Sequence, residues 1–263
     1  AFLRANDSVG NSWPTDPVVV DTVNDPGYSV SMLVHNGVPV MSYGDNSGSA
    51  NNLLYCVSQD ADGSAWNTPV LVTNPAGSNT SLAIVNGNPA IAHSSNSFGW
   101  MKFTRASAAD GSAWNAPVDI EFVGVSGRAS LQVVSGNPAI AYSFVGGLNY
   151  IRATNADGTT WGAPLVLDPG AAQPFLQMVN GRPAVGYASS VVGMRYIRAS
   201  DATGSAWGLA QTIDPVAAGT TAMQLIDGYP AVAYQALGDE DLRYSIAVDV
   251  DGSAWNPAVV LDS

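Results

Sequence analysis

The sequence predicts an all-β fold, and three observations support that prediction. Glycine and proline are abundant, with 27 and 16 residues, and they separate short apolar segments. This composition is typical of strands joined by tight turns. A glycine-bearing turn that leads into a tryptophan, as in residues 155–161, recurs along the chain at a period of roughly 47 residues. Four strand-like segments accompany each full recurrence. The recurring tryptophans are Trp13, Trp66, Trp114, Trp161, Trp207 and Trp255.

The four segments of a repeat are exemplified by residues 81–87, 88–94, 148–154 and 161–168. An Asn-Gly or Asp-Gly pair between the first two segments predicts a tight hairpin, because both residues tolerate positive φ. A proline two residues after that glycine suits the first position of a strand. Four short antiparallel strands repeated at this period describe a blade. The sequence therefore predicts a β-propeller of four-stranded antiparallel blades.

The strand count leaves the number of blades open. The prediction is a single β-propeller domain over 1–263, with a half-blade hairpin at 1–21. Third and fourth strands occur six times and first and second strands five times, since the chain opens on a third strand (Phe2–Asn6) and closes on a fourth (Val259–Asp262). Five full repeats plus an N-terminal hairpin fit a five-bladed ring, a six-bladed ring that lacks two strands, or part of a longer array. The predicted repeats are 22–73, 74–121, 122–168, 169–214 and 215–263.

Charge and cysteine content exclude several classes of function. The chain has 9 basic and 21 acidic residues, giving a net charge of −12. This balance argues against nucleic acid and anionic membranes as partners, because both require basic patches. No apolar run approaches the length of a membrane span. A single cysteine, Cys56, excludes an intrachain disulfide framework and a multi-cysteine metal site. The acidic, lysine-poor composition favours a secreted or cell-surface protein.

Several residue types recur at one position of each repeat, and we expect them to form the scaffold. The tryptophans are expected to pack between adjacent blades. His93 replaces a tyrosine in a column of core aromatics, and His35 lies in a Val/Ile column, so neither is expected to bind a ligand. The repeated arginines are expected to pair with blade-edge carboxylates or carbonyls, because identical positions in successive blades cannot converge on one substrate. These are Arg4, Arg105, Arg152 and Arg198.

The turn before each tryptophan resembles the Asp-box repeat of sialidase-like β-propellers, Ser/Thr-x-Asp-x-Gly-x-x-Trp. Gly158 and Trp161 hold the family spacing, whereas Asp157 is one place nearer the glycine and Asp60 is one place farther from it. The resemblance implies a structural turn. It also implies a catalytic set that includes an arginine triad, an Arg-Ile-Pro segment and a Tyr–Glu pair. Because Arg-Ile-Pro is absent and glutamate occurs twice, we expect no catalytic residues and no enzyme activity.

Calcium is the alternative explanation of the acidic turns. Asp60-x-Asp62-Gly63 and Asp249-x-Asp251-Gly252 resemble the start of a calcium loop, but the later bidentate carboxylate is missing. Aspartate side chains that close their own turns explain the pattern without a metal. We therefore expect no cofactor.

Candidate binding residues lie in the loops that differ between repeats, because recognition is usually built on variable loops of a rigid scaffold. Trp100 stands outside the tryptophan column and suits stacking on a sugar ring; the alternative is that it covers a blade edge. Phe98, Phe122 and Phe144 are further aromatic candidates. An acidic column at the fourth-strand ends (Asp21, Glu121, Asp168, Asp214, Asp262) indicates turn chemistry or a cation site. The candidate ligand-binding residues are Trp100, Asn46, Asn51, Asn52, Asn96, Tyr28, Asp239 and Asp241.

Three functional hypotheses follow. The first is a non-catalytic extracellular propeller that binds glycans or cell-surface polymers through these loops. The second is a structural or self-assembling module, a homo-oligomer in which the unpaired half-blade contacts another chain. The third is a glycoside hydrolase, for which the sequence identifies no inward carboxylate pair at suitable spacing.

Overall fold

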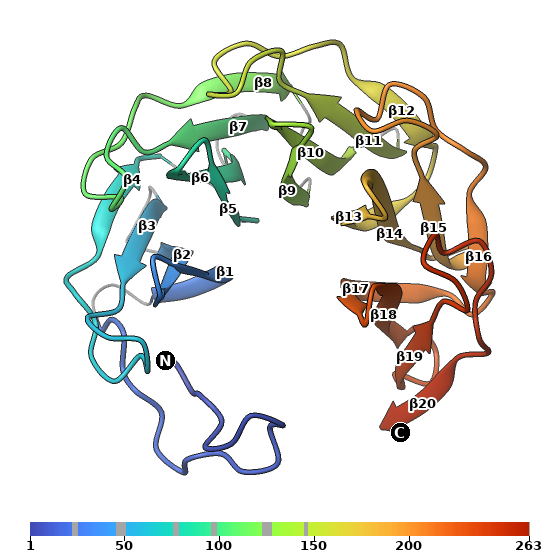
Figure 1. The fold of residues 1–263 in the computed structure, drawn as a ribbon, viewed down its shortest axis with the longest axis horizontal. Coiled ribbons are helices and arrows are strands. Elements are labelled where there is room, and N and C mark those ends of the chain that lie inside the picture. Colours follow the sequence, from blue (N-terminus) through green and yellow to red (C-terminus); the bar gives the residue numbers. More distant parts are fainter. Residues whose placement is uncertain are drawn as a thin grey trace. The chain divides into compact units, whose positions relative to one another are not determined.

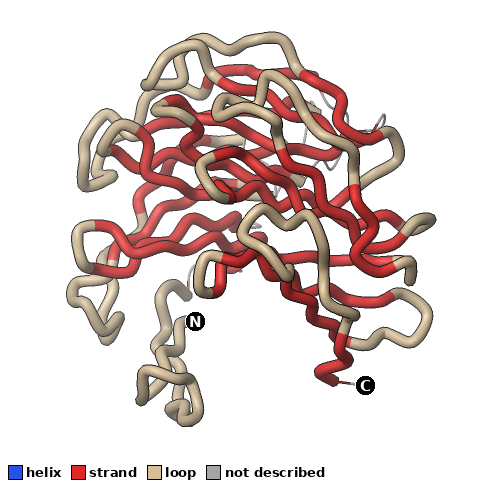
Figure 2. The backbone as a smooth tube through the Cα atoms, turned by 45° about the vertical axis from the view of Figure 1, so that its right-hand side comes forward, coloured by secondary structure: helices blue, strands red, loops and turns tan. Residues whose placement is uncertain are grey.

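A computed structural model describes residues 1–22, 26–45, 51–75, 79–95, 99–122, 128–144 and 147–262. The described chain consists of strands, turns and loops, with no helical segment in these ranges (Figure 2). Within them, no helix is long and apolar enough to cross a membrane. The strands form five four-stranded antiparallel sheets, each with its strands in sequence order. This arrangement confirms the predicted fold class, a β-propeller of four-stranded blades.

The chain divides into two compact units, Ala1–Ser126 and Gly127–Ser263, labelled by strand in Figure 1. The first unit holds the N-terminal segment and two sheets: β1 (Pro26–His35), β2 (Val38–Asp45), β3 (Asn52–Val57), β4 (Val70–Thr73), and β5 (Ser81–Val85), β6 (Asn88–Ser94), β7 (Trp100–Arg105), β8 (Val118–Phe122). The second unit holds three sheets: β9 (Ala129–Val134), β10 (Asn137–Phe144), β11 (Gly147–Arg152), β12 (Leu165–Asp168); β13 (Ala172–Val179), β14 (Arg182–Ser189), β15 (Gly193–Arg198), β16 (Gln211–Asp214); and β17 (Ala218–Ile226), β18 (Tyr229–Ala236), β19 (Leu242–Ile246), β20 (Val259–Asp262).

Successive sheets within the second unit pack side by side through their first strands. β13 contacts β9 on one side and β17 on the other, and these three strands line one edge of their unit in Figure 1. In the first unit, β1 and β5 are related in the same way. First strands thus form the inner edge of each unit, and fourth strands form its outer edge.

The hairpin between the first and second strands confirms the turn that the sequence predicts. At the β5–β6 turn, Asn86 has φ of 45° and Gly87 has φ of 80°, while Val85 pairs with Asn88 across the hairpin. Two consecutive positive φ angles define the hairpin turn whose twist matches that of the strands. Asparagine and glycine are therefore required by backbone geometry at this position.

The fourth strand of each sheet and the third strand of the N-terminal hairpin are shorter in the structure than the sequence predicts. The tryptophan before each fourth strand makes one isolated bridge, as Trp161 does with Ala153. In that sheet the regular fourth strand starts only at Leu165, because the proline before it has no N–H to donate. In the N-terminal hairpin, the predicted third strand Phe2–Asn6 is reduced to one bridge between Phe2 and Val18. Among the described residues, that segment has no second strand beside it, so its other edge has no ladder partner there.

Aromatic side chains hold neighbouring sheets together. We use the name tryptophan turns for the six segments 7–13, 60–66, 108–114, 155–161, 201–207 and 249–255. In the second unit, the ring of Tyr150 packs edge-on against Trp207, with centroids 5.0 Å apart. Tyr150 is almost fully buried, whereas Trp207 is only partly buried. The indole N–H of Trp207 donates to the Gly204 carbonyl of its own turn at 2.9 Å, so this polar group is satisfied without a partner sheet.

The glycine of a tryptophan turn makes room for the aromatic ring of the preceding sheet. Gly111 and Gly204 have φ of 75°, and a Cβ atom there would lie 2.2 Å from the Tyr55 ring and 2.7 Å from the Tyr150 ring. Glycine is therefore required both by its conformation and by the close approach of the ring. Four turns bind a ring of their own unit in this way: Gly63 with Phe2, Gly111 with Tyr55, Gly204 with Tyr150 and Gly252 with Tyr196.

Candidate functional site

The acidic residues of the tryptophan turns are occupied by their own backbone. The carboxylate of Asp60 accepts the N–H of Asp62 at 2.9 Å and that of Ser64 at 3.1 Å. Hydrogen bonds from the Ser64 hydroxyl and the Ser64 backbone N–H hold the pKa of Asp60 below its usual range. Asp249 forms the same bonds with Asp251 and Ser253, which confirms the prediction that these side chains close their own turns. Among the described residues, no three His, Cys, Asp or Glu side chains are grouped to hold a metal ion.

The repeated arginines bind sheet edges, as the sequence predicts. The guanidinium of Arg152 donates to the carbonyls of Val134 and Ser135 at 2.8 and 2.9 Å. Arg198 binds the equivalent carbonyls of its own sheet and also pairs with Asp251 at 3.0 Å. These arginines therefore tie the third strand to the turn of the first hairpin.

The opposite end of the sheets, which we name the rim, contains a second set of polar contacts. The rim is where the second strand ends, the third strand begins and the fourth strand ends. In the second unit, the buried Tyr187 hydroxyl donates to Asp168 of the preceding sheet at 2.6 Å, and Arg195 pairs with the same carboxylate. Burial and this bond to a carboxylate both raise the pKa of the Tyr187 hydroxyl. In the first unit, Tyr43 donates to Asp21 at 2.8 Å. The acidic column of the sequence thus binds buried tyrosines.

Arg243 extends this contact into an acidic cluster on the last sheet. Its guanidinium pairs with Asp214 at 3.1 Å, Asp239 at 2.8 Å and Asp241 at 3.6 Å. Burial alone would raise the pKa of Asp214, but hydrogen bonds from Tyr234, from a backbone N–H and from Arg243 hold it below its usual range. Asp214 is therefore ionised at neutral pH. The structure brings the predicted residues Asp239 and Asp241 together on one arginine.

Sequence reasoning missed the pairing between the tyrosine and acidic columns, although a signal was present. His93 replaces the tyrosine in one repeat, and Thr73 replaces the acidic residue of the preceding repeat. His93 is fully buried and contacts the Thr104 hydroxyl at 3.0 Å, so it is a core residue, as predicted. Burial lowers its pKa to about 4. The two exceptions fall at positions that are joined by a Tyr–Asp bond in three other places, Tyr43–Asp21, Tyr187–Asp168 and Tyr234–Asp214.

Trp100 lies at the rim of the second sheet and packs against Phe122. Their backbones pair across β7 and β8, and their rings meet edge to face with centroids 5.6 Å apart. Trp100 is partly buried, whereas 56% of Phe122 is exposed. Lys102 pairs with Asp119 at the next step of the same two strands. The result is a strip of two aromatic rings, one exposed and one partly buried, beside an ion pair.

Asn51 and Asn52, two further predicted residues of the first unit, lie at the rim of the first sheet. The Asn52 side chain donates to Asp45 at 3.0 Å and accepts a bond from Asn74. Asn51 is partly buried beside it in the chain. Tyr28 belongs to β1, and its side chain is not among those described. Asn46, Asn96 and Phe98 lie outside the described residues, and so does the side chain of Phe144.

A cleft of about 650 Å³ lies beside the N-terminal segment. Its lining includes Phe2, Arg4, Asp7, Pro14 and Asp62. None of the predicted binding residues that the structure describes lines it. The rim residues therefore form surface sites and do not belong to this cleft.

No protein-family model and no curated protein matches the chain. Similar solved structures are NanB with optactamide (TM-score 0.65, 12% identity), Trypanosoma rangeli sialidase with 2,3-difluorosialic acid as a covalent intermediate (0.58, 14%) and an α-L-arabinofuranosidase from Clostridium thermocellum (0.55, 11%). These matches cover 91%, 91% and 89% of this chain, and 61%, 48% and 94% of those chains respectively. The chain thus spans less than two thirds of NanB and of the sialidase. Its fold is that of a sialidase-like β-propeller.

The expectation that the chain is not an enzyme is contradicted by these matches. Structures that share its fold are named as a sialidase, an arabinofuranosidase and an exo-β-1,3-galactanase. At 11 to 14% identity the likeness itself shows the fold. The expectation failed because it equated the missing sialidase motifs with the absence of catalysis, whereas one fold hosts different sets of catalytic residues.

Proposed function

We propose that the protein binds carbohydrate and that the Trp100–Phe122 pair contacts the sugar. The observation that carries this proposal is the partly exposed aromatic pair at a rim position where the other sheets have no aromatic residue in place of Trp100. The positions equivalent to Trp100 are Asn52, Gly147, Gly193 and Asp241. No core requirement therefore places an aromatic ring there, because four other sheets form without one.

The chemistry of the strip suits a sugar ring. Aromatic faces carry partial negative charge and attract the C–H groups on the flat side of a pyranose. The Lys102–Asp119 pair at the next step of β7 and β8 supplies a hydrogen-bond donor and an acceptor for hydroxyl groups. The carbohydrate-related names of structures with this fold support the same class of ligand. An acidic, lysine-poor composition supports a secreted or cell-surface location, where polymeric glycans are accessible.

The experiment is a screen of monovalent oligosaccharides followed by titration of the best ligand into Trp100→Ala and Trp13→Ala. Both variants remove one partly exposed indole, but Trp13 lies in a tryptophan turn, away from the rim. Trp100→Ala is expected to weaken binding at least about tenfold, and Trp13→Ala to leave it unchanged. Equal affinity for Trp100→Ala and the unmodified protein would reject the site.

Glycoside hydrolysis at the Arg243 cluster is the second candidate. Hydrolases of this kind use two carboxyl groups on either side of the glycosidic bond, and Arg243 holds Asp214 and Asp239 on different nitrogens. Asp214 is buried beneath Tyr234 and ionised, whereas Asp239 is exposed. This pair offers one fixed carboxylate and one that is accessible to a substrate.

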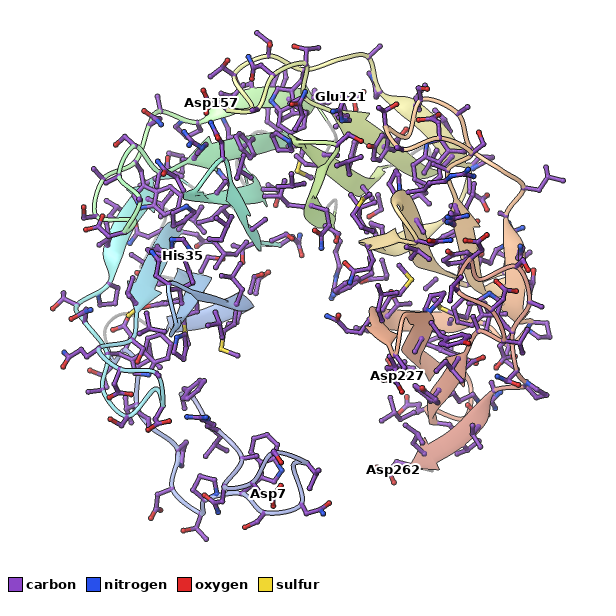
Figure 3. The ribbon with its side chains drawn as sticks, viewed as in Figure 1. Asp7, His35, Glu121, Asp157, Asp227 and Asp262 are labelled. Carbon is purple, nitrogen blue, oxygen red and sulfur yellow. The ribbon has the colours of Figure 1, made fainter. Side chains whose placement is uncertain are left out.

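Hydrolysis is tested with aryl arabinofuranosides, galactosides and sialosides by measuring the released phenol. Asp239→Asn is expected to lower the rate at least about 100-fold. Asp227→Asn serves as the control, because Asp227, labelled in Figure 3, lies at the turn between β17 and β18. Asp239 lies between β18 and β19, so the two residues are at opposite ends of β18. Turnover that survives Asp239→Asn would reject this cluster as the catalytic site.

A further inference from the structure

The N-terminal tryptophan turn holds no aromatic ring of its own unit among the described residues. In the turn at 7–13, the only neighbour within 4 Å of a Cβ atom on Gly10 would be Trp13 itself, at 4.0 Å. Trp13 is 55% exposed. The equivalent Trp255 is partly buried against Tyr196, with ring centroids 5.3 Å apart. The N-terminal turn therefore presents an unoccupied position for a ring.

This turn already has the conformation of the occupied ones. The carboxylate of Asp7, labelled in Figure 3, accepts the N–H groups of Val9 and Asn11 at 3.0 Å each. The Trp13 indole donates to the Gly10 carbonyl at 2.8 Å, as Trp255 does to Gly252 at 3.0 Å. Gly10 has φ of 74° and Gly252 has φ of 70°. A ring could bind here without rearrangement of the turn.

The last sheet carries the complementary half of this contact. Tyr244 on β19 is the equivalent of Tyr150 and Tyr196, but no tryptophan turn of its own unit packs on it among the described residues. The surrounding face is apolar and exposed. Leu242 and Ile226 are each 44% exposed, whereas their equivalents in the preceding sheet, Met194 and Val179, are fully buried. Asp262, at the end of β20 (Figure 3), likewise has no tyrosine partner among the described residues of its own unit.

The residues flanking the two halves also match each other. Arg4 pairs with Asp62 and Arg198 pairs with Asp251 where an occupied turn meets the preceding third strand. At the corresponding positions, the N-terminal turn has Val9 and the third strand of the last sheet, β19, has Ile246. Val9 is 73% exposed. An apolar pair therefore replaces the ion pair, so neither half would bury an unpaired charge in this contact.

We propose that the N-terminal tryptophan turn of one copy of this protein binds the exposed face of β17–β20 of a second copy, with Tyr244 packing on Gly10 and Trp13. The Tyr244 hydroxyl would donate to the Val9 carbonyl, as Tyr196 donates to the Asp251 carbonyl at 2.9 Å. Because the two surfaces differ, the contact is head to tail and gives rings or filaments. This inference does not depend on carbohydrate binding, although assembly would multiply the rim sites and raise avidity.

The experiment measures solution mass by light scattering over micromolar to submillimolar concentrations. The unmodified chain is expected to exceed its monomer mass of 27.1 kDa as concentration rises. Trp13→Ala and Tyr244→Ala are each expected to raise the dissociation constant at least about tenfold, whereas Trp100→Ala leaves it unchanged. Gly10→Val, which fills the unoccupied position from the turn side, should act like Trp13→Ala. Circular dichroism establishes that each variant is folded.

Mixing two variants separates a contact between copies from a general loss of structure. Trp13→Ala retains Tyr244, and Tyr244→Ala retains the tryptophan turn, so an equimolar mixture keeps one intact contact. The mixture is expected to form a 1:1 complex that neither variant forms alone. A mass of 27.1 kDa for the unmodified chain at every concentration would overturn the proposal. Association that persists in both variants would overturn it as well.

Discussion

Residues 7–13 and 249–255 form the same turn, yet the first turn is exposed and the second binds the ring of Tyr196. Both have an aspartate that accepts two backbone N–H groups and an indole that donates to the glycine carbonyl. They differ at the glycine: a Cβ atom on Gly252 would lie 2.8 Å from the Tyr196 ring, whereas one on Gly10 would meet only Trp13, at 4.0 Å. The comparison shows that turn geometry is set by local hydrogen bonds, whereas ring binding depends on a neighbouring sheet.

Substituting the glycines of an occupied and an unoccupied turn should produce the largest difference. Gly111 and Gly10 have nearly the same φ, 75° and 74°, so alanine strains both backbones by about 1–2 kcal/mol. In Gly111→Ala the new Cβ also clashes with the Tyr55 ring, adding about 1–3 kcal/mol. Urea unfolding at low protein concentration measures both free energies. Equal losses would mean that ring contact does not set the requirement for glycine.

At the rim, the pH dependence of stability distinguishes His93 from the tyrosine that forms a Tyr–Asp bond at the equivalent position of other sheets. Burial lowers the pKa of folded His93 to about 4, below its usual value of about 6.5. The unfolded chain therefore binds the extra proton first, and stability falls as pH drops from 6.5 towards 4, by about 3 kcal/mol in total. Unfolding free energies at pH 7 and 4.5 should fall less in His93→Tyr than in the unmodified chain. An equal fall in both proteins would contradict this assignment.

Rebuilding the missing bond tests whether the tyrosine and acidic columns act as pairs. Thr73→Asp alone and His93→Tyr alone each introduce one polar group without its partner. The double variant should recover about 1–2 kcal/mol relative to the sum of the single effects, as expected for neighbouring groups that bond. A double-mutant cycle in urea measures this coupling. Additive effects would show that the columns are independent at this position.

The smallest effect is expected from removing single hydroxyl groups. Tyr234→Phe removes a donor to the buried Asp214 and should cost about 1 kcal/mol, because Arg243 still binds that carboxylate. Tyr244→Phe should leave the unfolding free energy of the dissociated chain unchanged, since its hydroxyl has no partner among the described residues. Similar losses for the two variants would contradict the distinction between a filled and an unfilled contact.

Sequence periodicity predicted the sheets well because each repeat presents the same local signals. The segment 88–94 is β6 (Asn88–Ser94), and the predicted last strand is β20 (Val259–Asp262). These boundaries follow from hairpin turns and strand-starting prolines, which act over a few residues. The predicted strand at Phe2–Asn6 failed because its ladder partner comes from elsewhere in a full repeat.

The candidate site was only partly predictable. Trp100 was found because it breaks a repeated pattern, but its packing on Phe122 depends on the register of β7 and β8. The Tyr187–Asp168 bond joins two sheets, so no local pattern reveals it. Asp239 and Asp241 were predicted as binding residues because they lie in a variable loop, whereas Arg243, which binds both, was not predicted. Contacts between elements are set by packing, and a single repeat does not encode them.

The most direct test of carbohydrate binding at the rim is fluorine NMR of protein labelled with 5-fluorotryptophan. The chain has 7 tryptophans, and single Trp→Phe variants assign their signals. Titration with a monovalent oligosaccharide is expected to shift the Trp100 signal and to leave the signals of the tryptophan turns in place. A shift confined to another tryptophan, or saturable binding without any shift of Trp100, would contradict the proposed site.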